Sequence, residues 1–73
     1  MSATITYYTQ DDVIAGKGFK VFAKDEQGIN RGEYTGYWKP DYGTVTLYPA
    51  KGSWIYGRLV KTTVHERQIR RLY

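Results

Sequence analysis

The sequence is poor in the residues that small proteins use for covalent or metal cross-links. Its 73 residues include no cysteine, one histidine, one methionine and two prolines. Without cysteine the chain has no disulfides, no thiolate nucleophile and no thiolate ligands for zinc. Because small secreted domains commonly depend on disulfides, this composition predicts a cytoplasmic protein.

Long apolar segments are also lacking. Residues 1–10 alternate polar and apolar side chains and contain no continuous apolar run of the kind found in signal peptides and membrane spans. We therefore expect no membrane partner.

The net charge is +4, and the excess is unevenly placed. Residues 1–60 carry seven Lys and Arg against six Asp and Glu, whereas residues 61–73 carry four against one. A mild positive field of this kind attracts phosphate polymers or acidic proteins, but it does not by itself identify the partner.

The length and the glycine spacing together predict the fold class. A chain of 73 residues has no room for two independent cores, so we expect a single small β-barrel domain over residues 1–73. β-Branched and aromatic residues dominate the apolar set, and glycines recur at the short intervals typical of strands joined by tight turns. The predicted class is all-β, a small barrel or sandwich of short strands, with at most a short helical turn near the C-terminus.

Period-two alternation predicts two half-buried strands in the first third of the chain. Ile5 and Tyr7 mark the first of them, and Phe19, Val21 and Ala23 mark the second. The segment that follows, residues 25–33, contains two glycines and several charged side chains, which predicts an exposed hairpin tip.

Two turns that contain proline and glycine predict a three-stranded meander. Pro40 presets the backbone for a turn and Gly43 tolerates a positive φ, which joins a strand at 34–38 to one at 44–48. A second turn, at 49–52, leads into a third strand at 54–63.

The end of the chain suits one helical turn followed by a short strand, over residues 64–72. The meander at 34–63 and this ending together resemble the architecture of SH3-like small barrels. The resemblance implies a small five-stranded SH3-like barrel, and an OB-like barrel, also five-stranded, is the alternative. Within the meander, Val45-Thr46-Leu47-Tyr48-Pro49 is similar to the Val-Gln-Ile-Tyr-Pro stretch of the plasmid-type dihydrofolate reductases, which are tetramers of SH3-like subunits. That resemblance would imply an enzyme with a pore at a symmetry axis, but Thr46 stands where the family has its pore-lining glutamine.

The candidate binding surface is an aromatic and basic row on the predicted third strand. If Ile55 and Leu59 face the core, the alternation directs three larger side chains outward, with two tyrosines of the neighbouring strands beside them. The row and its neighbours are Trp54, Tyr56, Arg58, Tyr37 and Tyr48. Aromatic faces stack on bases and cations neutralise phosphate, so this composition favours nucleic acid, although Tyr, Trp and Arg are also enriched at protein interfaces. The alternative is that Trp54 and Tyr56 belong to the core.

A second candidate is the basic C-terminal cluster of Lys61, Arg67, Arg70 and Arg71. It suits phosphates or an acidic partner, and the alternative is plain solvated surface. Because side chains alternate along a strand, Arg70 and Arg71 should point to opposite faces, and one of them should be structural.

Catalytic signatures are weak throughout. His65 and Glu66 are adjacent, so on a strand they point apart and cannot orient one another. Asp11 and Asp12 suit a turn or a helix cap better than a metal site. The chain has no phosphate-loop, Rossmann or zinc-finger signature. We therefore expect a protein that is not an enzyme and has no cofactor or metal.

Two functions fit these residues. The first is a binding module that contacts DNA or RNA through the aromatic row and the basic cluster. The second is a protein-interaction or self-associating module, a regulator or inhibitor, that uses the same aromatic surface, and a homo-oligomer is predicted because large aromatic groups occupy both faces of one short strand. Salt dependence separates the two functions, because phosphate binding releases counterions.

Overall fold

The computed structural model describes residues 4–50 and 61–72, which form six strands and one short 3-10 helix. In chain order these elements are β1 (Thr6–Thr9), β2 (Gly18–Lys24), β3 (Asn30–Lys39), β4 (Thr44–Pro49), β5 (Thr62–His65), η1 (Glu66–Gln68) and β6 (Ile69–Arg71). The all-β class is confirmed. The prediction of five strands is wrong, because the described residues form six.

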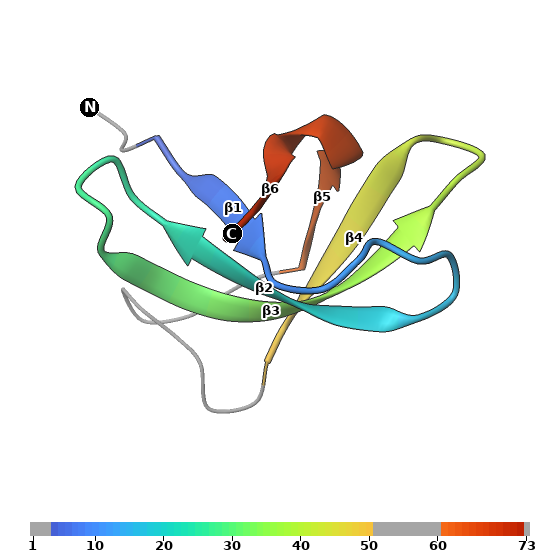
Figure 1. Cartoon of the computed structure of the whole chain (residues 1–73), viewed down its shortest axis with the longest axis horizontal. Helices are drawn as coiled ribbons and strands as arrows, with labels where there is room; N and C mark the ends of the chain where they lie inside the picture. Colours follow the sequence, from blue (N-terminus) through green and yellow to red (C-terminus); the bar gives the residue numbers. More distant parts are fainter. Residues whose placement is uncertain (1–3, 51–60, 73) are drawn as a thin grey trace.

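The strands make one sheet in the order β5-β4-β3-β2-β1-β6, and the sheet curls into a half-barrel (Figure 1). All neighbours are antiparallel except β1 and β6, which run parallel with Tyr8 opposite Arg70. The helical turn and short strand expected at the C-terminus are confirmed as η1 and β6. A hydrogen bond from Leu72 N to Thr9 O, 3.0 Å long, extends the contact with β1 by one residue.

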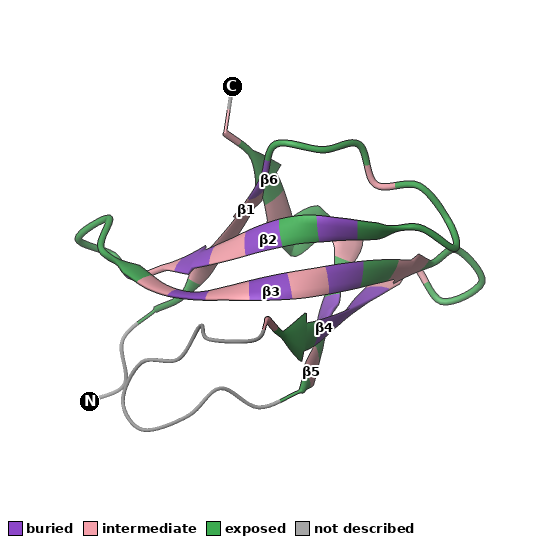
Figure 2. Cartoon of the chain, turned by 90° about the horizontal axis from the view of Figure 1, so that it is seen from below, coloured by how far each residue is buried: buried purple, intermediate pink, exposed green. Residues whose placement is uncertain are grey.

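The concave side of the sheet holds the hydrophobic core. Alternate residues of the strands face it, as the banding of buried and exposed positions along β2 and β3 in Figure 2 shows. The buried apolar residues are Phe19, Val21, Ala23, Tyr34, Val45, Leu47 and Val64. The connection between β1 and β2 adds Val13 to this core, and Ala15 bridges to Trp38. The inward positions predicted for β2 are confirmed, whereas Ile5 precedes β1 and is exposed.

The turn between β3 and β4 has the predicted chemistry. Tyr42 N donates to Lys39 O over 3.2 Å, and Gly43 N donates to Pro40 O over 3.3 Å. Gly43 has φ 62°, a left-handed conformation that glycine adopts without steric cost. This turn fixes the register of β3 against β4, and therefore which side chains share a face.

The structure describes only the end of the predicted third strand, from residue 61 onward. There, Thr62 and Thr63 lie in β5, which continues to His65 and pairs with β4 as the meander requires. Residues 51–60 lie outside the described residues, and with them the candidates Trp54, Tyr56 and Arg58.

The predicted exposed hairpin tip at residues 25–33 is confirmed for residues 26–29, which form the exposed turn between β2 and β3, and is wrong at both ends of the range. β3 begins at Asn30, and Asp25 is buried. Its Oδ1 accepts hydrogen bonds from the backbone N–H groups of Gln27 (2.9 Å) and Ile29 (3.0 Å), and its Oδ2 accepts one from Arg31 Nε (2.8 Å). Asp25 therefore organises the β2–β3 turn, because its carboxylate accepts three hydrogen bonds from residues of the turn and the start of β3.

The folded protein should lose stability in acid through Asp25. Burial by itself raises the pKa of this carboxyl, but the hydrogen bonds from Ile29, Arg31 and Gln27 and the charge of Arg31 outweigh it and lower the pKa below 3.8. A pKa lower in the folded than in the unfolded chain gives stability that is present above about pH 4 and is lost as the pH falls through the folded-state value.

We therefore expect the urea midpoint to fall between about pH 5 and pH 2, and to fall less in the Asp25→Asn variant. Asparagine keeps an oxygen for Gln27 and Ile29, so the variant should fold, but it has no carboxyl to titrate. Equal pH dependence of the two proteins would contradict the role given to Asp25.

Candidate functional site

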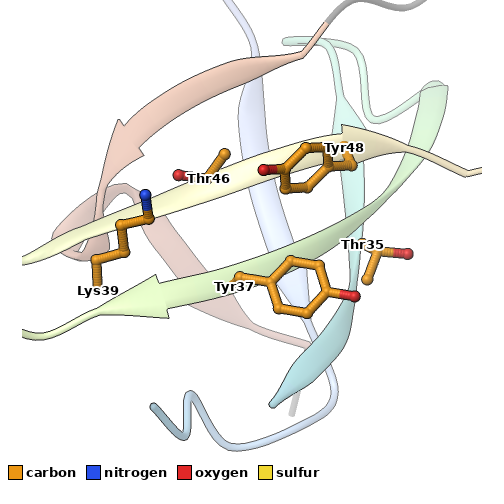
Figure 3. A pocket seen from close by; sticks show the side chains of 5 residues that line it. All are labelled: Thr35, Tyr37, Lys39, Thr46 and Tyr48. Carbon is orange, nitrogen blue, oxygen red and sulfur yellow. The ribbon is translucent and has the colours of Figure 1, made fainter. Parts of the chain in front are cut away.

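The convex side of β3 and β4 carries an open depression of about 500 Å³. Its lining residues, shown in Figure 3, come from alternate positions of the two strands: Thr35, Tyr37, Lys39, Thr46 and Tyr48. They point away from the core because the residues between them, Gly36 and Val45 among others, face it. The depression therefore lies on the solvent side of the middle of the sheet.

Two tyrosines form the wall of this depression. Tyr37 pairs with Thr46 and Tyr48 pairs with Thr35 across the antiparallel ladder, so the tyrosines are diagonal neighbours. Their ring centroids are 5.7 Å apart and their planes meet at 78°, an edge-to-face contact. Tyr37 is 41 % exposed and Tyr48 is 40 % exposed. The rings thus hold one another in place while each keeps a large surface open to a ligand.

Gly18 of β2 leaves room for the tyrosine pair because it has no side chain. Gly18 is the cross-strand partner of Tyr37. A Cβ atom at Gly18 would lie 3.1 Å from Cε1 and Cζ of the Tyr37 ring and 3.1 Å from Cγ2 of Thr35. The glycine therefore leaves the space in which the ring of Tyr37 rests.

The charge around the depression is positive. Lys61 Nζ lies 5.3 Å from the centroid of the Tyr48 ring, within the range of a cation–π contact, and Lys39 lines the depression itself. None of the described residues that line it is acidic. Thr46 is buried although it points outward.

Two other tyrosines belong to the core and have a different environment. Tyr7 and Tyr34 meet edge to face, with ring centroids 6.3 Å apart. Burial raises the pKa of Tyr7, and burial together with the charge of Tyr7 raises the pKa of Tyr34. The burial pattern thus separates structural tyrosines on the concave side from the exposed pair on the convex side.

The C-terminal basic residues do not join the tyrosine pair. Arg67 and Arg70 line a second hollow of about 360 Å³ with Ile5, Thr6 and Gln68. Arg71 points to the other face of β6 and forms an ion pair with Asp12. Asp12 therefore lies in a loop and holds β6 to the β1–β2 connection, and no helix follows it.

The structure brings together three of the candidate residues predicted from sequence: Tyr37, Tyr48 and Lys61. Arg67 and Arg70 share the second hollow, Arg71 is tied to Asp12, and Trp54, Tyr56 and Arg58 lie outside the described residues. Sequence reasoning missed Lys39, which shares a face with Tyr37 two positions away. Extending the alternation of β3 from Tyr37 to its end would have found it.

His65 has a structural task. Its Nδ1 accepts a hydrogen bond from Arg67 N over 3.4 Å, and its own N–H donates to Gln68 Oε1 over 2.8 Å. These reciprocal bonds cap η1. The cap orients the turn that carries Arg67 and leads into β6.

Comparison with known proteins finds no matching family and no significantly similar curated protein or solved structure. Among the described residues, no group of three or more His, Asp or Glu side chains is placed to hold a metal ion. Within the same ranges, no helix is long and apolar enough to cross a bilayer.

Proposed function

We propose that the protein is a small-barrel module, of the SH3-like or OB-like kind, that binds single-stranded nucleic acid on the convex side of β3 and β4. The observation that carries this proposal is the exposed Tyr37–Tyr48 pair with Lys61 over one ring and Lys39 alongside. Aromatic rings on a sheet surface stack on bases of any sequence, and lysines beside them neutralise the adjoining phosphates.

The shape of the depression favours a single strand. Its two rings meet nearly at right angles, so a base can stack on one ring while its edge contacts the other. Such contacts need bases that are not already stacked within a duplex. The lysines attract the backbone without reading sequence, so we expect little sequence preference.

Removing one ring should weaken binding strongly. We expect Tyr48→Ala to cost about 1–3 kcal/mol of binding free energy to an eight-nucleotide oligothymidylate, roughly a 5- to 150-fold loss of affinity. Tyr48→Phe should bind like the wild type, because stacking uses the ring face and not the hydroxyl. The matched control is Tyr42→Ala, which removes a tyrosine that is 76 % exposed in the β3–β4 turn outside the depression. Fluorescence anisotropy in low salt measures the affinities, with a thermal melt for each variant.

The salt dependence tests the lysines separately from the rings. Lys61→Gln should reduce the salt slope of binding by about 0.7, the value for one phosphate contact on a single strand, whereas Tyr48→Ala should leave the slope nearly unchanged. Lys17→Gln, in the exposed turn before β2, removes the same charge elsewhere and is the control.

If the folded wild type has no affinity for single-stranded DNA or RNA in low salt, the proposal is wrong. The protein-interaction alternative would then account for the exposed tyrosine pair. Self-association and a cytoplasmic location stay predictions of the sequence.

A further inference from the structure

The second hollow gathers two arginines that have no carboxylate partner in the described part of the chain. Arg67 comes from η1 and Arg70 from β6, and Ile5, Thr6 and Gln68 complete the lining. The other two described arginines are paired, Arg31 with Asp25 and Arg71 with Asp12. Two guanidinium groups at one hollow repel each other, and an anion bound between them removes that cost.

The lining suits a phosphate group in particular. Guanidinium groups present planar forks of N–H donors that match phosphate oxygens in pairs. Thr6 adds a hydroxyl, and the described lining contains no acidic side chain. A phosphate would therefore find donors from several directions.

The convex face between the two hollows is itself aromatic and basic. Phe22 on β2 is the cross-strand partner of Tyr8 on β1, which is the partner of Arg70 on β6. Lys24 Nζ lies 5.4 Å from the centroid of the Tyr8 ring, which repeats the arrangement of Lys61 over Tyr48. Rings and cations thus continue across the sheet from one hollow to the other.

One acidic residue interrupts this path. Glu33, the cross-strand partner of Phe22, lies 3.9 Å from Lys20 Nζ, so its charge is balanced within the face. The path therefore keeps its excess of positive charge between the tyrosine pair and the arginines.

We propose that the Arg67–Arg70 hollow binds a backbone phosphate of the same single strand whose base stacks on the Tyr37–Tyr48 pair. The inference rests on the proposed function and adds to it a second contact, at the arginine hollow, for the same nucleic-acid strand. Neighbouring strands are about 4.8 Å apart, so the two hollows, on β3–β4 and β1–β6, are separated by roughly 14 Å across the strands. The register adds a further offset along the strands, because Tyr37 lies opposite Gly18 whereas Arg70 is level with Phe22. A stacked strand rises about 3.4 Å per nucleotide, so a dinucleotide reaches one hollow only and an octanucleotide reaches both.

The test compares oligothymidylates of two and eight nucleotides by NMR titration. The dinucleotide should shift the ring resonances of Tyr37 and Tyr48 and leave the Nε–H signals of Arg67 and Arg70 in place. The octanucleotide should shift all four. In the double variant Arg67→Gln/Arg70→Gln, octanucleotide affinity should fall about 10- to 100-fold, as expected for lost hydrogen bonds to a charged group, with dinucleotide affinity within about twofold of the wild type. Lys17→Gln is the control for loss of a positive charge elsewhere on the chain.

The outcomes separate this inference from the proposed function. If the octanucleotide shifts only the tyrosines, or if the double variant weakens both oligonucleotides equally, the arginine hollow is not a second contact and the inference is overturned while the proposed function stands. If neither oligonucleotide shifts the tyrosines, the proposed function fails and this inference fails with it. If the dinucleotide shifts the signals of the two arginines and not those of the tyrosines, the primary site is the arginine hollow. That result would overturn both the proposed function and this inference.

Discussion

Replacing Leu47 with alanine should lower the free energy of unfolding by about 2–5 kcal/mol, the usual cost of truncating a large aliphatic side chain in a closed core. Leu47 is 0 % exposed and is among the largest fully buried side chains in the described residues. It lies on β4 directly opposite Gly36 of β3, where no side chain from that position can move in to fill the space. The cavity should therefore persist, which places the expected cost in the upper part of the range.

The size of the protein makes this loss severe. A domain of 73 residues has a total stability of roughly 4–11 kcal/mol. We expect the thermal midpoint of Leu47→Ala to fall by at least about 10 °C, measured by circular dichroism. The control is Ile14→Ala, which truncates an aliphatic side chain that is 50 % exposed and should change stability by less than about 0.5 kcal/mol. A similar midpoint for both variants would mean that Leu47 is not at the centre of the core.

Local signals in the sequence were sufficient for the part of the fold that carries the tyrosine pair. The alternation around Val21 and the turn at Pro40 and Gly43 both predict what the structure contains, because they depend only on neighbouring residues. The β3–β4 register that follows from that turn places Tyr37 and Tyr48 on one face. The same register explains why these two candidates lie together, although the sequence named them as neighbours of Trp54, Tyr56 and Arg58, which lie outside the described residues.

Other parts of the molecule depend on contacts that a single sequence does not reveal. Nothing in residues 69–71 indicates that they pair in parallel with β1, so the separation of Arg70 from the tyrosines could not be predicted. The burial of Asp25 was not predicted, because charged residues close to Gly28 and Gly32 are typical of an exposed loop, and the hydrogen bond from Arg31 to Asp25 spans six residues. β3 extends from Asn30 to Lys39 and is longer than the predicted strand at 34–38. The alternation pattern did not reveal its full length, because Gly32 and Gly36 stand at inward positions where the pattern requires an apolar side chain.

Gly36 itself should be among the least tolerant positions of the sheet. It lies opposite Phe19 on β2, and a Cβ atom there would meet Phe19 Cζ at 2.9 Å and Val45 Cγ1 at 3.0 Å. Both neighbours are buried core side chains, so neither can move aside into solvent. Alanine favours a strand over glycine by about 0.5–1 kcal/mol through backbone entropy, but overpacking a closed core costs about 1–3 kcal/mol. We therefore expect Gly36→Ala to be destabilising, and urea unfolding measures the change.

Gly18→Ala is the matched variant on the opposite face of the same sheet. The new Cβ would meet the Tyr37 ring and the methyl group of Thr35 at 3.1 Å, and the exposed ring can swing outward to make room. Stability should therefore change by less than about 0.5 kcal/mol, as for a surface substitution. Single-strand binding should weaken, because the ring no longer rests beside Tyr48. Gly36→Ala should show the reverse, a lower urea midpoint with unchanged affinity in the folded fraction. If both variants lose stability to the same extent, the convex face is as tightly packed as the core, and the space at Gly18 does not serve the tyrosine pair.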